Sequence, residues 1–323
     1  MFQVIRYLVG AVLVLVLAVA IYLGLNWAPD KPVSELAGRW AAPPSTFIEV
    51  MGMQVHVRDE MAAGANPDAM PIVLLHGTSD SLHTWGGWAE VLQAERRVVR
   101  FDLPGFGLTG PFPAGDYSIE HYVRFVLAVM DTLDIPQAII AGNSFGGHLA
   151  WEVAYEAPER VPALVLVDAA GYLFETESMP IGFRIAQIPA LAPVMNRVLP
   201  RGMVESSVRN VYADPGKVTP ELVDRYYELT LREGNRAALS ARFQQARGRS
   251  DAAERLATLQ MPALILWGGQ DRLITPESAL RFERDLPAGT LHMFPELGHV
   301  PQEEDAAATV AVVREFIASR EVP

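Results

Sequence analysis

The stretch Gly142-Asn143-Ser144-Phe145-Gly146 directly follows an apolar run at residues 138–141 and has the form Gly-x-Ser-x-Gly. The apolar run is typical of a buried β-strand, and residues 147–157 after it predict a helix that stops before a proline. A serine on such a sharp strand-to-helix turn adopts a strained backbone, and the flanking glycines leave room for it. The turn lifts the Ser144 hydroxyl clear of the sheet, so we expect Ser144 to be a nucleophile.

A serine nucleophile that attacks a carbonyl also needs hydrogen-bond donors for the oxyanion that forms. The same turn aims the N–H of Phe145 at that position. A second donor is expected from the loop after an earlier strand, where the run at residues 72–75 ends in His76-Gly77. We predict the N–H of Thr78 as this donor, with a plain glycine turn as the alternative.

A serine hydroxyl needs a base to take its proton and an acid to orient that base, in the chain order Ser, acid, His. His299 lies in a loop after the last apolar run and is the predicted base. Asp271 follows the run at residues 263–267 and is the predicted acid. Asp168 also follows an apolar run and is the competing acid.

Three aromatic residues are candidates for lining a substrate pocket. His83 and Trp85 follow the predicted Thr78 donor in the same loop, and Phe183 lies in an apolar stretch further along. Each of them could equally be ordinary packing.

Apolar runs alternate with predicted helices over much of the chain, which favours a mostly parallel sheet covered on both faces. A hairpin is predicted at residues 46–59, with a turn at Met51-Gly52. The predicted catalytic residues all follow strand ends, where the functional loops of such sheets lie. About 90 residues between the runs at 163–167 and 263–267 break the alternation, and we interpret residues 172–261 as an inserted helical cap. The predicted core therefore comprises residues 46–171 and 262–323.

Residues 7–25 form an uncharged apolar run, which as a helix would be about 28 Å long and could span a bilayer. We predict a membrane anchor over residues 1–27, with a cleaved signal peptide as the alternative. Residues 28–45 contain four prolines and are predicted to be a tether. We expect a single-pass protein of a bacterial inner membrane, with the catalytic domain in the periplasm.

The composition excludes several classes of function. The net charge of −12 argues against nucleic-acid binding, which needs a basic face. The absence of cysteine excludes disulfides, thiolate catalysis and cysteine-bound zinc.

Together, five ordered motifs resemble the α/β-hydrolase fold family, in its capped serine esterase and lipase-like branch. They are His76-Gly77, Asp102-Leu103-Pro104-Gly105-Phe106-Gly107, Gly142-Asn143-Ser144-Phe145-Gly146-Gly147, Trp267-Gly268-Gly269-Gln270-Asp271 and Gly298-His299. The resemblance implies an α/β fold with a mostly parallel eight-stranded sheet, helices on both faces and the cap, and it implies no metal or organic cofactor. The serine at position 144 distinguishes this chain from the members of the fold that use an aspartate nucleophile. Thr78-Ser79-Asp80-Ser81 replaces the glycine-rich loop usual in ring-cleavage hydrolases.

The sequence therefore predicts a membrane-tethered serine hydrolase that cleaves apolar carboxylic esters, acyl or aromatic, through an acyl-enzyme. The expected partners are a small ester or lipid-like substrate and the membrane itself. The alternatives are a carbon–carbon bond hydrolase of the ring-cleavage type and a perhydrolase or haloperoxidase with the same triad. A non-catalytic binding module on the same scaffold is the alternative from another class.

Overall fold

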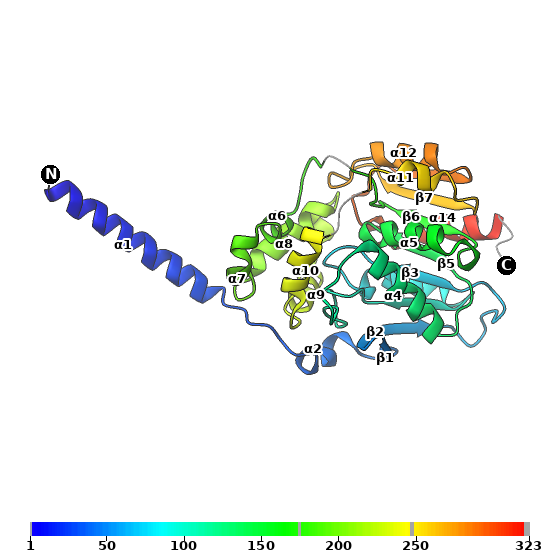
Figure 1. Ribbon diagram of the computed structural model, residues 1–323, viewed down its shortest axis with the longest axis horizontal. Helices are drawn as coiled ribbons and strands as arrows, with labels where there is room; N and C mark the ends of the chain where they lie inside the picture. The colour runs from blue at the N-terminus through cyan, green and yellow to red at the C-terminus, as the bar shows by residue number, and fades with distance from the viewer. Residues whose placement is uncertain (1, 174–175, 246–248, 320–323) are drawn as a thin grey trace.

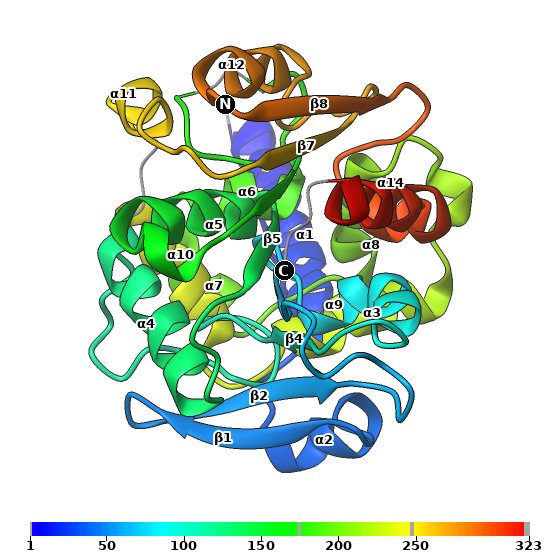
Figure 2. The same ribbon diagram turned by 90° about the vertical axis from the view of Figure 1, so that its right-hand side faces the viewer.

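The computed structural model describes residues 2–173, 176–245 and 249–319, and its core is one sheet of eight strands (Figures 1 and 2). The order in the sheet is β1-β2-β4-β3-β5-β6-β7-β8. Strand β2 runs antiparallel to both its neighbours, and the other pairs are parallel. The strands are β1 (Thr46–Val50), β2 (Met53–Glu60), β3 (Ile72–Leu75), β4 (Val98–Phe101), β5 (Ile139–Asn143), β6 (Leu164–Val167), β7 (Ala263–Gly268) and β8 (Gly289–Phe294).

The first two strands form the hairpin predicted from the sequence. Val50 pairs with Met53, so the loop is the two residues Met51 and Gly52. Both have positive φ angles, 51° and 77°, as two-residue hairpin turns require.

Helices cover both faces of the sheet (Figure 2). The central strands are buried on both sides, so alternate residues of one strand enter different cores: Val73 and Leu75 belong to one, Ile72 and Leu74 to the other. The first core is covered by α4 (Ile119–Thr132), α5 (Phe145–Glu156), α11 (Ala252–Leu256) and α12 (Glu277–Asp285), and the second by α3 (Gly86–Leu92) and α14 (Ala306–Ser319). Short helical turns η1 (Leu82–Trp85), η2 (Pro158–Arg160) and α13 (Pro301–Glu304) complete the core.

A group of helices between β6 and β7 stands at one side of the sheet and forms a cap (Figure 1). It consists of α6 (Ile181–Ala186), η3 (Pro189–Leu191), α7 (Ala192–Met195), α8 (Arg201–Val211), η4 (Pro215–Lys217), α9 (Pro220–Thr230) and α10 (Asn235–Gln245). Helix α9 is capped at its start by Thr219, whose hydroxyl accepts a hydrogen bond from the N–H of Leu222 at 3.2 Å. Within the predicted cap range, α11 contacts α5 and α12 instead, so it packs with the core.

Residues 28–45, which the sequence predicts to be a tether, are docked on the rest of the protein. We call this segment the strap. It contains the helix α2 (Val33–Trp40), whose Leu36 is buried between Leu108 of the core and Leu229 of the cap. Backbone bridges join Trp27 to Val198 and Lys31 to Arg232 at its cap side.

Charged side chains also hold the strap against the cap. Asp30 pairs with Arg236 of α10 at 2.5 Å, and Arg39 pairs with Glu228 of α9 at 2.6 Å. The same Glu228 accepts a 2.6 Å hydrogen bond from the indole of Trp40. The strap therefore bridges cap and core. The helix before it, α1 (Phe2–Leu25), has no buried residue and extends away from the domain (Figure 1).

Candidate active site

Ser144 lies between the last residue of β5 and the first residue of α5, with φ 55° and ψ −115°. A non-glycine residue is rarely found in this region, and the strain is typical of a nucleophile turn. A Cβ atom added at Gly142 would lie 2.1 Å from the carbonyl oxygen of Gly146. A Cβ atom added at Gly146 would lie 2.1 Å from the carbonyl oxygen of Leu75. Both glycines are thus required for the turn to pack against its neighbours.

His299 and Asp271 are in direct contact, although 28 residues separate them in the chain. Nδ1 of His299 lies 2.7 Å from Oδ2 of Asp271, and both residues are buried. The other carboxylate oxygen of Asp271 accepts hydrogen bonds from the backbone N–H groups of Leu273 and Ile274 at 2.8 and 3.1 Å. Asp271 is therefore held in place to orient the imidazole. His299 and Ser144 line the same cavity.

Asp168, the competing acid, lies beside Asp271 rather than taking its place. Ligand atoms of Asp168, Asp271 and His299 all lie within 4.8 Å of one another, yet the histidine's hydrogen bond goes to Asp271. One oxygen of Asp168 accepts the N–H of Gly268 at 3.0 Å, and the other has no hydrogen-bond partner in the described part of the chain. Burial, together with the charge of Asp271, raises the pKa of Asp168 well above its usual value. The surroundings of Asp168 therefore favour the protonated, uncharged form of its carboxyl.

This raised pKa makes a testable prediction about stability. The folded state keeps a proton on Asp168 that the unfolded chain loses above about pH 4, so this residue makes the free energy of unfolding fall as pH rises. Asp168→Asn removes the titration and keeps the shape. We expect the free energy of unfolding of the variant, relative to that of wild type, to increase as pH rises above about 4, measured by urea unfolding. A difference that stays flat or falls with pH would contradict the raised pKa.

The same three residues also satisfy the distance test for a metal site. Two ligands of one tetrahedral Zn²⁺ at about 2.0 Å are separated by about 3.3 Å. His299 and Asp271 are only 2.7 Å apart, which suits a shared proton. The distance between His299 and Asp271 is therefore that of a hydrogen-bonded pair.

The loop that carries Thr78 passes directly beside the nucleophile. A Cβ on Gly77 would lie 3.3 Å from that of Ser144, and both Gly77 and Thr78 line the cavity. His76 fixes the loop, with Nδ1 2.7 Å from the Gly77 carbonyl and Nε2 accepting the N–H of Leu103 at 2.9 Å. Burial lowers the pKa of His76, in agreement with a neutral ring that accepts a hydrogen bond. The loop that carries Thr78 therefore lies beside Ser144 at the cavity.

The cavity lies between the core and the cap and has a volume of about 1000 Å³ including its mouth. Phe183, a predicted pocket residue, lines it. Most of the other lining side chains from the cap are apolar: Ala186, Met195, Leu199, Met203, Val204, Val208, Val211 and Leu239.

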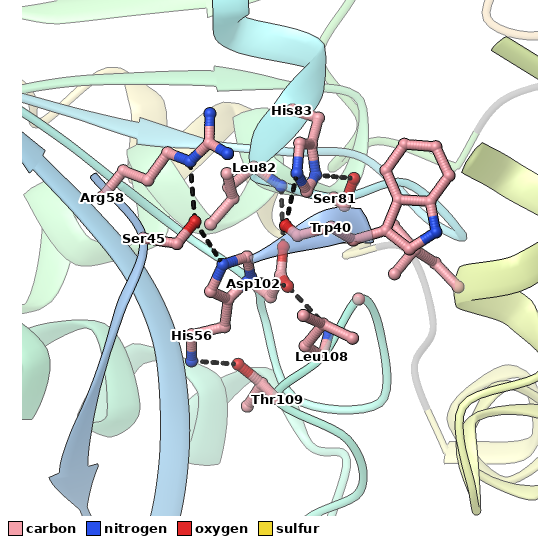
Figure 3. A network of polar contacts seen from close by, with 12 residues as sticks. Trp40, Ser45, His56, Arg58, Ser81, Leu82, His83, Asp102, Leu108 and Thr109 are labelled. Atoms are coloured by element: carbon pink, nitrogen blue, oxygen red, sulfur yellow. Dashed lines mark hydrogen bonds and ion pairs between the residues drawn. The ribbon is translucent and has the colours of Figure 1, made fainter. Parts of the chain in front are cut away.

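The other two predicted pocket residues, His83 and Trp85, do not border this cavity, because η1 turns them away from it. Trp85 is fully buried in the second core with its ring 4.9 Å from that of Trp88. His83 lies in the network of Figure 3, where Nε2 is 2.9 Å from the carbonyl of Trp40 in the strap. Burial lowers the pKa of His83 to about 3. Both residues are structural.

Figure 3 also shows a second serine–histidine–aspartate chain, away from the cavity. His56 is 2.7 Å from Asp102 and 2.8 Å from the hydroxyl of Ser45. Asp102 accepts the N–H groups of Leu82 and Leu108 at 2.8 and 2.7 Å. Asp102 therefore braces two loops, and the network attaches the end of the strap to β2.

The structure adds charged residues at the cavity that the sequence analysis missed. Arg236 lines it and is paired with Asp30. Asp80 also lines it, and lies 3.6 Å from Arg225 of α9, which forms a 2.7 Å ion pair with Glu303. Burial, and then the charge of Glu303, raises the pKa of Asp80 to about 7. Only the fold brings these distant partners together, so no local signal marks them.

Comparison with known proteins identifies the class. Residues 70–306 match the α/β hydrolase fold family, so the chain belongs to that family. It is 29% identical over 260 residues to a 2-hydroxy-6-oxo-2,4-heptadienoate hydrolase of Pseudomonas putida, covering 78% of this chain and 90% of that protein. It is also 29% identical to a 2-hydroxymuconate semialdehyde hydrolase of a Pseudomonas species, over 84% of this chain and 93% of the relative.

Solved structures agree with this assignment. A meta-cleavage product hydrolase of Pseudomonas fluorescens is 27% identical, with a TM-score of 0.72 over 85% of this chain and 98% of that one. A membrane phospholipase A described as a bacterial virulence factor is 22% identical, with a TM-score of 0.72, and shares the fold over 97% of this chain and 98% of its own. The family, the eight-stranded fold and the hydrolase class predicted from the sequence are thereby confirmed.

Proposed function

We propose that this chain is a serine hydrolase that cleaves apolar carboxylic esters. The observation that carries the proposal is that Ser144 and His299 line one largely apolar cavity, with Asp271 holding the histidine.

In the proposed mechanism the Ser144 hydroxyl attacks the ester carbonyl carbon while His299 takes its proton. The N–H groups of Phe145 and Thr78 hold the oxyanion of the tetrahedral intermediate. His299 then gives the proton to the departing alcohol, which leaves an acyl group on Ser144. A water molecule, deprotonated by His299, attacks the acyl carbonyl and releases the carboxylic acid and the free enzyme.

The charges around the cavity favour a neutral substrate. Arg236 borders the cavity, but its guanidinium is neutralised by Asp30 and its Nη1 donates to the Met195 carbonyl at 3.1 Å. Most of the cap residues that line the rest are apolar. Such a lining favours acyl or aromatic groups over charged ones.

The second candidate is hydrolysis of a carbon–carbon bond in a vinylogous diketone, and the names of the relatives support it. Their named dienoate substrate carries a carboxylate, which calls for a cation at the site. In this chain Arg236 is already paired, and Thr78-Ser79-Asp80 stands where ring-cleavage hydrolases usually have glycines. These two features favour the ester.

A direct comparison of the two substrate types tests the choice. The purified enzyme is given 4-nitrophenyl esters of two to twelve carbons and, separately, a 2-hydroxy-6-oxo-2,4-dienoate, with Ser144→Ala as the blank. We expect a kcat/KM at least tenfold higher for the best ester. A higher value for the dienoate would assign the carbon–carbon reaction instead.

We further propose that α1 anchors the protein in a bacterial inner membrane, with the catalytic domain in the periplasm. The helix is about 36 Å long and has a mean hydropathy of 2.9, which suffices to cross a bilayer, although a signal sequence has the same properties. Its end is joined to the cap through the bridge of Trp27 to Val198. Exposed apolar side chains lie on the cap just before that bridge, at Ile188, Leu191 and Val194. This arrangement would suit a lipid-like ester.

Cell fractionation tests the anchor. We expect the full chain to remain in membranes after carbonate extraction, and a variant that begins at Trp27, and so keeps the strap, to be soluble and active on short esters. Membrane topology is read from a periplasmic reporter fused to the C-terminus. A mature protein whose N-terminus lies at Ile21 or later would show a cleaved signal instead.

A further inference from the structure

One buried arginine of the cap has no acidic partner among the residues that the structure describes. Arg242 of α10 is 7% exposed, and it forms no ion pair with any residue that the structure describes. Its Nε, buried as well, donates no hydrogen bond within the described ranges. Burial lowers the pKa of Arg242 to about 10, so the side chain is still a cation at neutral pH. Burying a charge without a counter-ion costs folding free energy, and this fold nevertheless buries the Arg242 guanidinium.

The contacts of Arg242 reach the two residues whose N–H groups form the proposed oxyanion hole. Its Nη2 donates to the hydroxyl of Thr78. Its guanidinium carbon lies 4.0 Å from the centre of the Phe145 ring, a cation–π contact. The edge of Tyr122 holds that ring from another side, with 5.0 Å between ring centres. One cap side chain thus touches the loop after β3 and the start of α5.

Arg242 is not among the residues that line the cavity, while Thr78 is. Arg242 therefore reaches the proposed oxyanion hole through its contacts with Thr78 and Phe145. During the reaction a negative charge develops on the carbonyl oxygen held by the Thr78 and Phe145 amides. This transient anion is the counter-charge that Arg242 lacks in the resting protein.

We propose that Arg242 is a positioning residue of the oxyanion hole, which fixes Thr78 and Phe145 and favours the anionic tetrahedral intermediate by its charge. The inference rests on the proposed serine hydrolase function and holds for either substrate class, because both reactions pass through such an oxyanion. It also makes the cap part of the catalytic apparatus, since α10 carries the arginine.

The test uses Arg242→Met, which keeps the length and removes the charge, and Arg242→Lys, which keeps the charge. We expect Arg242→Met to lower kcat by about 10- to 100-fold with KM within threefold of wild type, because loss of a full oxyanion donor costs about 10²–10³. The logarithm of kcat for Arg242→Lys should lie at least a third of the way from the value for Arg242→Met back to the wild-type value. Arg249→Met, which breaks the contacts of a half-buried arginine with Glu152 and Glu120, is the control and should keep kcat within twofold.

Two further measurements separate this role from simple packing. A boronic acid, which forms a tetrahedral anion on the serine, should lose affinity for Arg242→Met by the same factor as kcat, while an uncharged substrate amide should not. Thr78→Val keeps the backbone N–H and removes the acceptor. Its effect on kcat should be about threefold or more in wild type and absent in Arg242→Met, which is the non-additivity expected of contacting residues.

The inference is overturned if folded Arg242→Met keeps kcat within twofold, or if only KM rises, which would make Arg242 a binder of ground-state substrate. If Arg242→Met does not fold, Thr78→Val decides, and unchanged kcat and boronate affinity would overturn the inference. A wild-type protein that neither turns over substrate nor reacts with a fluorophosphonate would instead remove the proposed function, and this inference with it.

Discussion

Replacing Ser144 by alanine is expected to lower kcat on the best ester by on the order of 10⁶-fold, as in other serine triads. The alanine has no oxygen to attack the carbonyl, and no other hydroxyl occupies the strained turn between β5 and α5. The fold should persist, because the change removes one atom from a side chain at the edge of the cavity. Initial rates measure the effect, and thermal unfolding checks the fold.

His299→Ala serves as the comparison for this prediction. The two residues act as a unit, so the double variant should be no slower than either single one. If Ser144→Ala keeps activity within tenfold of wild type, Ser144 is not the nucleophile. If the fold-loss of kcat in the double variant equals the product of the fold-losses in the two single variants, the residues act independently and the triad assignment fails.

Replacing Asp271 by asparagine is expected to lower kcat by about 10⁴-fold, the size known for the same change in a serine protease. The Asp271 carboxylate accepts a hydrogen bond from Nδ1–H of His299 at 2.7 Å, which leaves Nε2 unprotonated to act as the base. An asparagine amide presented there would favour the opposite tautomer. The melting temperature should change little, because the amide fills the same space.

Asp168→Asn is the matched control, since the two carboxyls lie within 4.8 Å of each other. Burial raises the pKa of Asp168, so an uncharged amide resembles its favoured form, and we expect kcat within tenfold of wild type. The reverse ranking, with Asp168→Asn the slower variant, would move the orienting acid from β7 to the end of β6.

The fold could be predicted in detail because its signals are local. The apolar runs became strands, the two-residue turn at Met51 set the hairpin, and Ser118 and Thr219 cap the helices that follow them. The Ser144 turn and the contact of His299 with Asp271 followed from motif order, because loops at the carboxyl ends of parallel strands meet at one edge.

The strap could not be predicted, because its partners are far away in the chain. Its prolines suggest a free tether, whereas burial of Leu36 and the pairs of Asp30 and Arg39 with cap residues fix it. A variant that begins at Ser34 would lose Asp30 and leave Arg236 without its counter-ion beside the cavity.

The directions in which side chains point could not be predicted from the sequence either. His83 and Trp85 follow the oxyanion loop in sequence, but a short 3₁₀ turn points them into the core and toward the strap. Arg242 shows the converse, since it lies about 100 residues beyond the nucleophile and still touches Phe145. Sequence distance did not indicate spatial distance in either case, because the cap folds back over the sheet.

The central claim is that Ser144 is an activated nucleophile. The most direct test is to treat the full-length protein with a fluorophosphonate and to locate the adduct by mass spectrometry of the peptides. We predict one adduct per chain, on Ser144, formed at a rate that falls at least a hundredfold in His299→Ala. The absence of an adduct, or an adduct on any other residue, would contradict the account.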